Sequence, residues 1–595
     1  MAADPELSQA IAAHQGGNLL EAERLYRAFL GKQPDHADAC ALLGVVLGSC
    51  GRYAEAIEWV NKATALDPDS GILFFHQGTV LMTAQKISEA IAAFTRAVAL
   101  QPDAPQMHYN LANALRAADD WQGAIAQYRE TLRCDNKFLD AYNNLALSLV
   151  HEKEYDSALH LAMQAVALDA SYGEGWLTLS NVAEKLKDYD VAVGAGKRAV
   201  DLMPGNHYAW FGYGVALNRV NRDEEAVAAY QTALKLKPSR ADIWDNLAQT
   251  YQSLNRLEEA EATFEKAVDV AGQTIEDEEG REVDESEYGN RHWHLALIEL
   301  LRGDYQQGFA RYRARVHAIP QLKRLPFPCP LWKGEDLRGK TLLVCDEQGY
   351  GDTLMLARFL PLLRAEGARI VFSVHPVLAP LLRGWTGADT VIAHEEQVPP
   401  CDYFCSSFDL PHRVGATLEN LPHQVPYLPV LPPDDATLLP AGGFKVGVVW
   451  GGSPLHLGDI KRSVPLSLFA DLFSVPGVRF YSFNRDLKPG DAALLPHYPI
   501  ENLVPRLTDF AAAARLIGQM DLVISCDTAT AHLAGGLGKK TWVMLPFAPD
   551  WRWLTGRDDS PWYPTMRLFR QPRAGDWKSV VAGVRAALVN QELQR

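Results

Sequence analysis

The sequence lacks the features of membrane and exported proteins. No uninterrupted apolar run approaches the roughly 18 residues that a membrane-spanning helix needs. The first residues, MAADPELSQA, show no charged-then-apolar leader. The eight cysteines are irregularly spaced, which does not indicate a disulfide framework, and the one close pair, Cys401 and Cys405, lacks the second pair of a zinc site. We therefore expect a cytoplasmic protein without membrane insertion or a bound metal.

Clustered positive charge is also missing. The chain has 57 Lys and Arg against 73 Asp and Glu, a formal net charge of -16, and no long basic run. Because nucleic acids and anionic membranes are bound through clustered cations, we expect neither as a partner. The hydrophobic fraction of 48% is ordinary for folded proteins, and at roughly 100–200 residues per domain the chain should form three or four units.

What the sequence does contain is a strong internal repeat of 34 residues. Alanine recurs at Ala22, Ala56, Ala90, Ala124, Ala158, Ala192, Ala226 and Ala260. A second register of small residues runs Gly44, Gly78, Ala112, Ala146, Ser180, Gly214 and Ala248. Proline occupies a third register at Pro34, Pro68, Pro102, Pro204 and Pro238, with Asn136 and Ala170 as exceptions. A bulky register comprises Phe74, His108, Tyr142, Trp176, Trp210 and Trp244.

This pattern predicts stacked helix hairpins. Small residues let two helices approach, the bulky residue fills the groove between repeats, and proline ends the second helix. Stacking eight such hairpins buries one continuous core in a superhelical solenoid. The registers resemble the tetratricopeptide repeat over residues 3–274. A ninth unit, WHLALIELLRGDYQQGFARYRAR, keeps the spacing and is expected to cap the array within residues 275–324, after the acidic segment IEDEEGREVDESE, which we interpret as a solvated loop.

One polar register gives the array a candidate binding surface. A residue two places before the small packing position points about 200° away from the partner helix. This register holds Asn110, Asn144 and Asn246, with His76 and Thr178, and is interrupted at Gly212. It is similar to the asparagine ladder of O-GlcNAc transferase, which grips extended polypeptide backbone, and amides suit that task because they donate and accept at once. The alternative is asparagine solvated on an exposed helix face.

After the array, apolar strands alternate with helices. The segment GKTLLVCDEQGYGDTLMLARFLPLLRAEGARIVFSV predicts a strand, a glycine-rich turn, a helix and another strand, and a second series begins at FKVGVVWGGSP. Such alternation indicates parallel sheets covered on both faces. We predict two Rossmann-like domains, 325–435 and 436–595, separated near PPDDATLLPAGG, with a ligand cleft between their strand carboxyl ends.

The first turn carries the predicted catalytic residue. In DEQGYGDTLM, Gly349 and Gly351 permit a tight turn, but Leu354 replaces the third glycine of a dinucleotide fingerprint, which disfavours an NAD site. Asp352 stands where a helix begins, and its carboxylate would repel a phosphate bound at the same helix end. Two interpretations remain, a helix cap and a general base facing the cleft.

The segment SCDTATAHLAGGLGKKTWVML predicts the opposite side of the cleft. Asp527 ends a strand, and a helix from Thr528 to Leu537 would present its free N–H groups as an anion site, with Gly538 as its C-terminal cap. Thr528 and His532 share one helix face because they are four residues apart. His532 is interpreted as a ligand-binding residue, the alternative being a buried packing histidine.

Positive charge for a phosphate is expected from Lys461 and Arg462, in the loop after the strand KVGVVW. The alternative is two surface cations preceding a helix capped by Ser463. The aromatic segment PDWRWLTGRDDSPWYPTMRLFRQ is expected mainly to pack between domains, with Arg552 and Trp553 as candidate cleft residues.

The motifs GDTLMLARFLPLL, GVVWGG and CDTATAHLAGGLGKKTWVML resemble the heptosyltransferase-like GT-B glycosyltransferases over residues 339–590. This resemblance implies Asp352 as catalytic base and Lys461 or Arg462 as a contact to the donor phosphate. It also implies nucleotide-sugar binding by a motif that maps onto Asp527, Thr528, Ala529 and His532, where Ala529 replaces the usual glycine.

A tetratricopeptide array joined to such a half is similar to the bacterial flagellin-modifying glycosyltransferases. The resemblance implies a metal-independent protein O-glycosyltransferase that transfers a sugar, typically a nonulosonic acid such as pseudaminic acid, from a nucleotide donor to Ser or Thr of flagellin. No cofactor is expected beyond the nucleotide-sugar, and the absence of an Asp-x-Asp signature at a strand end agrees with protein cations at the phosphate. Two alternatives are transfer to lipopolysaccharide or another glycan, and a non-catalytic repeat scaffold or chaperone.

Overall fold

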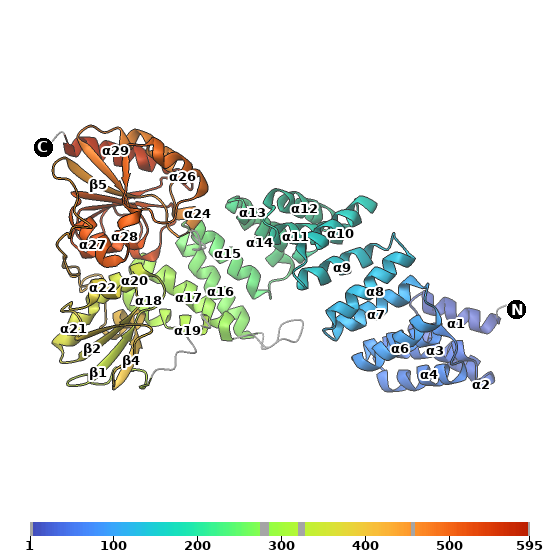
Figure 1. The fold of residues 1–595 in the computed structure, drawn as a ribbon. Coiled ribbons are helices and arrows are strands. Elements are labelled where there is room, and N and C mark those ends of the chain that lie inside the picture. Colours follow the sequence, from blue (N-terminus) through green and yellow to red (C-terminus); the bar gives the residue numbers. More distant parts are fainter. Residues whose placement is uncertain (1–3, 274–284, 319–327, 454–458, 593–595) are drawn as a thin grey trace. The chain divides into compact units, whose positions relative to one another are not determined.

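A computed structural model describes residues 4–273, 285–318, 328–453 and 459–592. The chain divides into two compact units, residues 1–238 and 239–595. The first unit is entirely helical, and the second combines helices with two parallel sheets (Figure 1). Among the described residues, no helix is both long and apolar enough to cross a bilayer.

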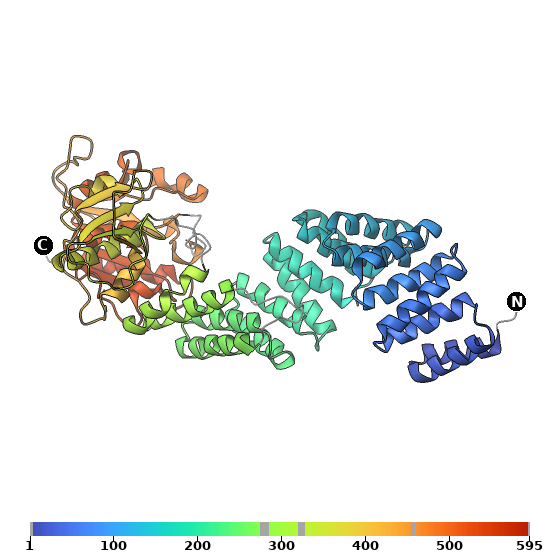
Figure 2. The same cartoon turned by 90° about the horizontal axis from the view of Figure 1, so that it is seen from below.

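The first unit is a series of antiparallel helix pairs (Figures 1 and 2). Its helices are α1 (Pro5–Gln15), α2 (Leu19–Lys32), α3 (Ala37–Ser49), α4 (Tyr53–Leu66), α5 (Gly71–Thr83), α6 (Ile87–Leu100), α7 (Pro105–Ala117), α8 (Trp121–Cys134), α9 (Leu139–His151), α10 (Tyr155–Leu168), α11 (Gly173–Lys185), α12 (Tyr189–Leu202), α13 (His207–Arg219) and α14 (Asp223–Leu236). The second helix of each pair ends two residues before the proline register, as predicted. The repeated small residues are buried where the two helices meet.

The turn inside each hairpin contains one residue with left-handed backbone. These residues recur every 34 positions: Gly17, Gly51, Gln85, Asp119, Lys153, Lys187, Asn221 and Asn255. Only the first two are glycine, although a positive φ costs other residues about 1 kcal/mol. The side chains at this position differ in type, so the sequence shows no repeat there. The left-handed backbone conformation nevertheless recurs at the same 34-residue interval as the alanines.

The bulky register has a second role beyond filling space between repeats. The indole N–H of Trp176 donates to the carbonyl of Ala170 at 3.0 Å, and that of Trp210 donates to Pro204 at 2.9 Å. His108 bonds the carbonyl of Pro102 at 2.9 Å in the same way. Each bond reaches six residues back to the turn between repeats, so this side chain satisfies a carbonyl that the preceding helix leaves free.

The close helix contact within a hairpin gives a stability prediction. A Cβ atom on Gly78 of α5 would lie 2.6 Å from the Phe94 ring of α6. We expect Gly78→Ala to lower the free energy of unfolding by about 1–3 kcal/mol through overpacking. Gly194→Ala in α12 is the matched control, because its Cβ would meet nothing within 4 Å. In this control variant the higher helix propensity of alanine should raise the free energy of unfolding by about 0.5–1 kcal/mol. Denaturant unfolding of the full chain checks both, and equal effects would contradict the packing argument.

The second unit begins with the last helices of the array. These are α15 (Ala241–Ser253), α16 (Leu257–Gln273), α17 (Glu285–Arg302), α18 (Tyr305–Tyr312) and the short α19 (Arg315–Ala318), green to yellow-green in Figure 2. The helices α17 and α18 form the predicted ninth hairpin, in which Ala296 is buried and Gly308 packs on Leu300. Most of the acidic segment lies outside the described residues.

The first sheet follows these helices. Its strands are β1 (Thr341–Cys345), β2 (Arg369–Val374), β3 (Thr390–Ala393) and β4 (Tyr403–Ser406), all parallel in the order β3-β2-β1-β4. Between β1 and β2 the chain forms α20 (Tyr350–Leu356), a 3-10 turn at 357–359 and α21 (Leu360–Ala365), and α22 (Ala379–Leu382) follows β2. A 3-10 turn at 407–409 and α23 (Leu410–Arg413) follow β4.

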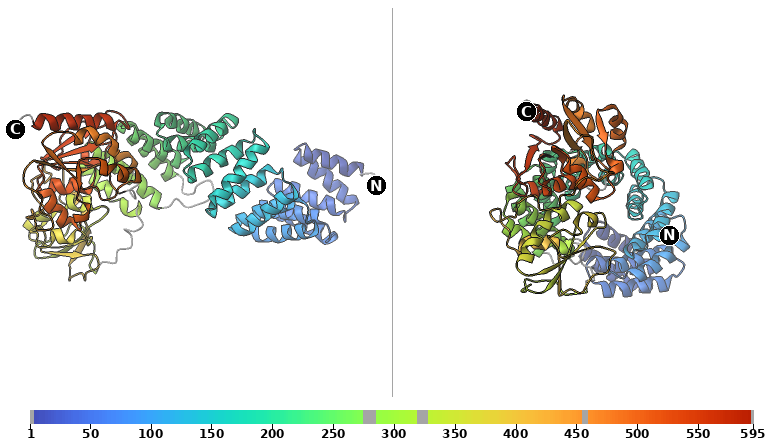
Figure 3. Two further views of the ribbon diagram at one scale, coloured as in Figure 1. Left: turned by 45° about the horizontal axis from the view of Figure 1, so that its top comes forward. Right: turned by 60° about the vertical axis from the view of Figure 1, so that its left-hand side comes forward.

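The second sheet has six parallel strands in the order β10-β9-β8-β5-β6-β7. They are β5 (Phe444–Val449), β6 (Val478–Ser482), β7 (Ile500–Asn502), β8 (Leu522–Cys526), β9 (Thr541–Leu545) and β10 (Met566–Arg570). The helices are α24 (Asp459–Arg462), α25 (Ala470–Phe473), α26 (Pro489–Leu494), α27 (Phe510–Gly518), α28 (Ala529–Gly536) and the terminal α29 (Trp577–Glu592), drawn in red in Figure 3. Its 3-10 turns lie at 466–469, 495–497, 504–506 and 551–553, the last being η7 (Trp551–Trp553). The predicted parallel α/β architecture is confirmed.

One disulfide departs from the expectation drawn from cysteine spacing. Cys329 and Cys401 are bonded, although they are 72 residues apart. The pairing arises from folding rather than from local spacing: the Phe404 N–H donates to Pro330 at 2.9 Å, which brings the segment before β1 alongside β4. Cys405, the other member of the predicted close pair, is buried and unbonded to sulfur.

Candidate functional site

The loop from β1 to α20 is fixed by a buried ion pair. Arg315 of α19 is fully buried and donates to both carboxylate oxygens of Glu347, at 2.7 and 2.8 Å. The same guanidinium donates to Asp409 at 3.1 Å. The carboxylate partners raise the pKa of Arg315 although burial opposes its charge. The short helix α19, which follows the ninth repeat hairpin, therefore holds the loop that leads to Asp352.

A second contact fixes the same loop. Gln348 has a positive φ of 66°, which is unusual outside glycine, and its side-chain amide donates to the Tyr312 hydroxyl at 2.9 Å. Tyr312 is buried and stacks on Phe408. The backbone conformation that turns the chain into α20 is thus maintained by an aromatic side chain of α18.

Asp352 lies in the first turn of α20 with both carboxylate oxygens bonded. One oxygen accepts the Gly349 N–H at 3.0 Å, which closes a capping box. The other accepts from the guanidinium of Arg552. Burial raises the pKa of Asp352 above its ordinary value, and the charge of Arg552 opposes that shift. The cap interpretation is confirmed, and the base role remains a prediction that requires Arg552 to move away.

Arg552 connects the two halves of the site. It belongs to η7, after the second sheet's β9, and it also bonds Asp550 at 2.5 Å. Its guanidinium lies 4.5 Å from the centre of the Trp551 ring. The side chain is 10% exposed, yet its Nε has no hydrogen-bond partner among the described residues. The sequence predicted Arg552 only as a candidate cleft residue, because the motif does not show which carboxylates it contacts.

The second half of the site surrounds the start of α28. Asp527 follows β8, and its backbone carbonyl accepts from Arg462 at 3.1 Å. The Arg462 side chain is 18% exposed and packs against Gly452. Its Nε lies 3.6 Å from the carboxylate of Asp459, an ion pair too long for a hydrogen bond, and within the described chain this Nε has no hydrogen-bond partner. Thr528 precedes the helix, with its hydroxyl 3.0 Å from that of Ser525. Arg462 and the start of α28 thus both lie next to Asp527.

His532 is buried behind this helix end. Its Nδ1 bonds the Tyr563 hydroxyl at 2.9 Å, and its Nε2 lies 3.9 Å from Asp527. The ring stacks on Trp553 with 5.3 Å between centroids. Burial, with the charge of Arg552, lowers the pKa of His532 well below its ordinary value. His532 is thus a neutral group that orients its neighbours.

The two α/β halves are in direct contact here. A Cβ atom on Gly351 of α20 would lie 2.7 Å from the His532 ring and 3.3 Å from Ala529. Glycine is therefore required at this position by the close approach of α20 and α28. The contact brings together the predicted base and five of the six predicted nucleotide-sugar-binding residues, which are Arg462, Asp527, Thr528, Ala529 and His532.

Two groups of predicted residues lie elsewhere. Lys461 is exposed, and its ammonium donates to the Ser253 hydroxyl at the end of α15, 3.2 Å away. Asn144 donates to the Tyr109 hydroxyl at 2.9 Å, and Asn246 donates to the carbonyl of Asp242 in its own helix at 2.8 Å. Asn110 is half-buried, and no described residue pairs with its amide. Among these three asparagines, only Asn110 has both its side-chain oxygen and its side-chain NH₂ without a hydrogen bond to another described residue.

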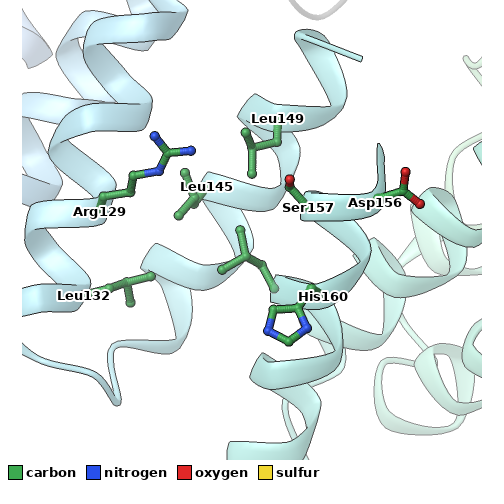
Figure 4. Close-up of a pocket in the computed structure, with 8 residues that line it drawn as sticks. Arg129, Leu132, Leu145, Leu149, Asp156, Ser157 and His160 are labelled. Carbon is green, nitrogen blue, oxygen red and sulfur yellow. The ribbon is translucent and has the colours of Figure 1, made fainter. Parts of the chain in front are cut away.

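The array also has a hollow outside this register. It has a volume of about 540 Å³ and is lined by residues of α8, α9 and α10, among them Leu145 and Leu149 of α9 (Figure 4). The other lining residues are Arg129, Leu132, Asp156, Ser157, His160 and Leu161. The helices α8 and α10 are second helices of their repeats, and α9 between them is the first helix that also carries Asn144.

The titration of Asp527 gives a pH-dependent prediction. Burial and the nearby Asp550 raise the pKa of Asp527 to about 6. A carboxyl whose folded pKa exceeds its unfolded value of about 4 loses stability as pH rises between those values. We expect the free energy of unfolding of Asp527→Asn, relative to that of the parent, to increase across this window by about 3 kcal/mol. Denaturant unfolding from pH 4 to 7 measures it. A pH-independent difference would contradict the assignment, and the exposed Asp435→Asn is the control.

Comparison with known proteins supports the helical part. Models described as tetratricopeptide repeat match residues 7–71 with 75–137, and residues 241–274, and a model described as TPR repeat matches 214–255. The chain is similar to Protein FlbA of Caulobacter vibrioides, with 30% identity over 322 residues, 49% of this chain and 54% of that protein. It therefore spans about half the length of this curated relative.

Solved structures give similar matches. One is YrrB, titled a TPR protein with an unusual peptide-binding site, with 25% identity, a TM-score of 0.27, and coverage of 31% of this chain and 95% of that one. Another is pilF of Pseudomonas aeruginosa, with 23% identity, a TM-score of 0.31 and coverage of 34% and 93%. The family matches together with the stacked hairpins show a tetratricopeptide solenoid, followed by α/β domains.

Proposed function

We propose that this chain is a glycosyltransferase that modifies a protein held by its repeat array, using a nucleotide-sugar as donor. The main observation that supports this proposal concerns Arg462 and Arg552. Both guanidinium groups are mostly buried, and the Nε of each has no hydrogen-bond partner among the described residues. Unpaired buried N–H groups are costly unless a ligand meets them. A phosphate is a fitting ligand because guanidinium binds it through charge and paired hydrogen bonds.

A nearby arginine supports this reading by contrast. Arg358 is also buried, but its Nε donates to Met355 at 2.8 Å, and its other nitrogens bond Pro422, Trp562 and Tyr427. Its guanidinium further stacks on three aromatic rings. Arg358 is therefore a structural cation with bonds to fixed groups, whereas Arg462 and Arg552 retain donors for a ligand.

The proposed reaction uses this charge at the leaving group. The nucleotide phosphate would lie between Arg462, Arg552 and the start of α28, where N–H donors and cations stabilise the charge that develops as the sugar departs. Binding of that phosphate would compete with Asp352 for Arg552, so Asp352 would lose its bond to this guanidinium in the donor complex. Lys461 would join this set if it leaves Ser253.

The acceptor is proposed from the repeat array. Tetratricopeptide repeats indicate a protein-binding role, and the free amide of Asn110 offers contacts to extended backbone. We propose flagellin as this protein and a nonulosonic acid such as pseudaminic acid as the sugar, on the resemblance described above. Serine or threonine would be the modified residue.

The test is the intact mass of flagellin coexpressed with the chain and without it. A mass increase that depends on the chain is expected, and its size gives the mass of the transferred group. The matched variant Arg462→Gln should reduce the modified fraction, whereas Arg506→Gln, a cation on the same half that bonds Ala436 and Leu438, should not. Unmodified flagellin that still binds the chain would instead support a scaffold, the second candidate, favoured by the closed Asp352–Arg552 pair.

A further inference from the structure

A second group of titratable side chains lies at the carboxyl edge of the first sheet. Asp346 follows β1, His375 follows β2 and His394 follows β3. These three strands are neighbours in the sheet. Parallel strands present their carboxyl ends at one edge, which is where α/β folds bind ligands. Asp346 begins the motif DEQGYGDTLM, but neither it nor the two histidines has a role in the site described above.

Asp346 and His394 form a bonded pair. The Nε2 of His394 lies 2.5 Å from one oxygen of Asp346, whose carboxylate is 8% exposed. The other oxygen accepts the backbone N–H of His375 at 2.9 Å. A carboxylate only accepts, so the Nε2 of His394 carries the hydrogen. Asp346 is fixed from two strands and in turn fixes the tautomer of His394.

The free nitrogen of His394 is accessible. Its side chain is 46% exposed, and no group in the described ranges bonds its Nδ1. In the neutral ring this Nδ1 carries the lone pair. The arrangement is a proton acceptor whose ring is oriented by a buried carboxylate, as general bases commonly are.

This edge faces the other α/β half. Tyr350, the first residue of α20, packs against the His375 ring at 4.9 Å and against Phe510 of α27 at 5.5 Å between centroids. The Phe510 N–H also donates to the carbonyl of Val377 at 3.1 Å. The histidine pair therefore lies along the same junction as Asp352. The difference is that both oxygens of Asp352 are bonded, whereas the Nδ1 of His394 is open.

We propose that His394, positioned by Asp346, accepts the proton of the acceptor hydroxyl in the sugar transfer proposed above, in place of the predicted base Asp352. The inference rests on that function. The hydroxyl oxygen forms a bond to the anomeric carbon while its proton passes to Nδ1 of His394. The bond from that carbon to the donor phosphate breaks, and its electron pair leaves with the nucleotide. His394 then releases the proton to water.

Other ionisable groups surround this pair. The hydroxyl of Tyr350 is 3.5 Å from Nε2 of His375, and the ring centroids of His375 and His394 are 5.9 Å apart. Glu395 and Glu396 follow His394 in the chain, and Glu396 is paired with Arg383. His375 differs from His394 in that its Nδ1 already accepts the Val377 N–H, at 3.4 Å. His375 is therefore the matched control.

The experiment measures transfer to flagellin against pH, with the nucleotide-activated form of pseudaminic acid as the donor probe. His394→Gln keeps an amide that can donate to Asp346 but removes the basic nitrogen. It should lower kcat/KM by about 100-fold or more and abolish the loss of rate at low pH. His375→Gln should stay within a few-fold of the parent. Asp346→Asn, with His394 intact, should shift the pH profile, which a purely structural role would not do.

The outcomes separate the two proposals. If the parent transfers sugar and His394→Gln retains its rate and pH profile, the inference is overturned while the proposed function stands. If the parent transfers no sugar, the proposed function fails and the inference fails with it. If His394→Gln does not fold, the pH profile of Asp346→Asn decides: an unchanged profile overturns the role of His394.

Discussion

Replacement of Arg552 by glutamine is expected to lower the rate of sugar transfer by about 100-fold or more, the cost of removing one preorganised donor from a developing negative charge. Arg552 is the one side chain that bonds Asp352 of the first α/β half and Asp550 of the second within the described structure. The variant loses the proposed phosphate contact and also the bond that holds Asp352. Single-turnover transfer to flagellin, followed by intact mass, measures the effect.

The matched control is Arg557→Gln. Arg557 lies five residues after Arg552 and forms a partly exposed ion pair with Asp559 at 2.6 Å. Its substitution should leave the transfer rate unchanged. Arg552→Gln leaves Asp352 without its cation, which could destabilise the fold. The thermal unfolding temperature of the variant should therefore be measured together with its transfer rate. The charge-conserving Arg552→Lys should keep the fold and lose part of the rate, because lysine lacks the planar fork. Transfer by folded Arg552→Gln at the parental rate would rule out the phosphate role.

Replacement of Arg315 by methionine is expected to lower the free energy of unfolding of the second unit by about 3–5 kcal/mol. Arg315 is fully buried and is bonded to Glu347 and Asp409, so its removal leaves two buried carboxylates without a cation. The side-chain volume is largely kept, which separates the charge effect from a cavity. Denaturant unfolding monitored by tryptophan fluorescence measures it.

Two further variants make this prediction specific. Arg313→Met, two residues away and exposed, should change stability by less than about 0.5 kcal/mol. The double variant Arg315→Met with Glu347→Gln should recover part of the loss, because one uncompensated charge is removed with its partner. Additive losses in the double variant would show that the ion pair contributes little beyond packing.

The repeat array was predictable because its determinants are local. Each hairpin uses the same small, bulky and proline positions, so eight copies of one pattern are visible at 34-residue intervals. The strands β1, β5, β8 and β9 are similarly visible, because a strand buried on both faces is a continuous apolar run. In each case a short window of sequence contains the physical cause.

The site was predictable only in part. The positions of Asp352 and Asp527 follow from strand ends and helix starts, which a sequence shows. The partner of Asp352 does not, because Arg552 lies 200 residues away and the contact depends on how the two sheets meet. The asparagine register shows the same limit: periodicity gives the direction of Asn144 but not the Tyr109 hydroxyl that it bonds.

The ninth repeat hairpin has a consequence for dividing the protein into fragments. Tyr305 of α18 accepts a hydrogen bond from the Trp562 indole at 2.9 Å, Tyr312 bonds Gln348, and Arg315 neutralises Glu347. A fragment begun at residue 325, with the α/β domains alone, would expose these aromatic surfaces and leave a buried acid unpaired. The smallest fragment with an intact interior therefore starts no later than α17. In terms of folding, the last repeat belongs with the α/β domains rather than with the other repeats.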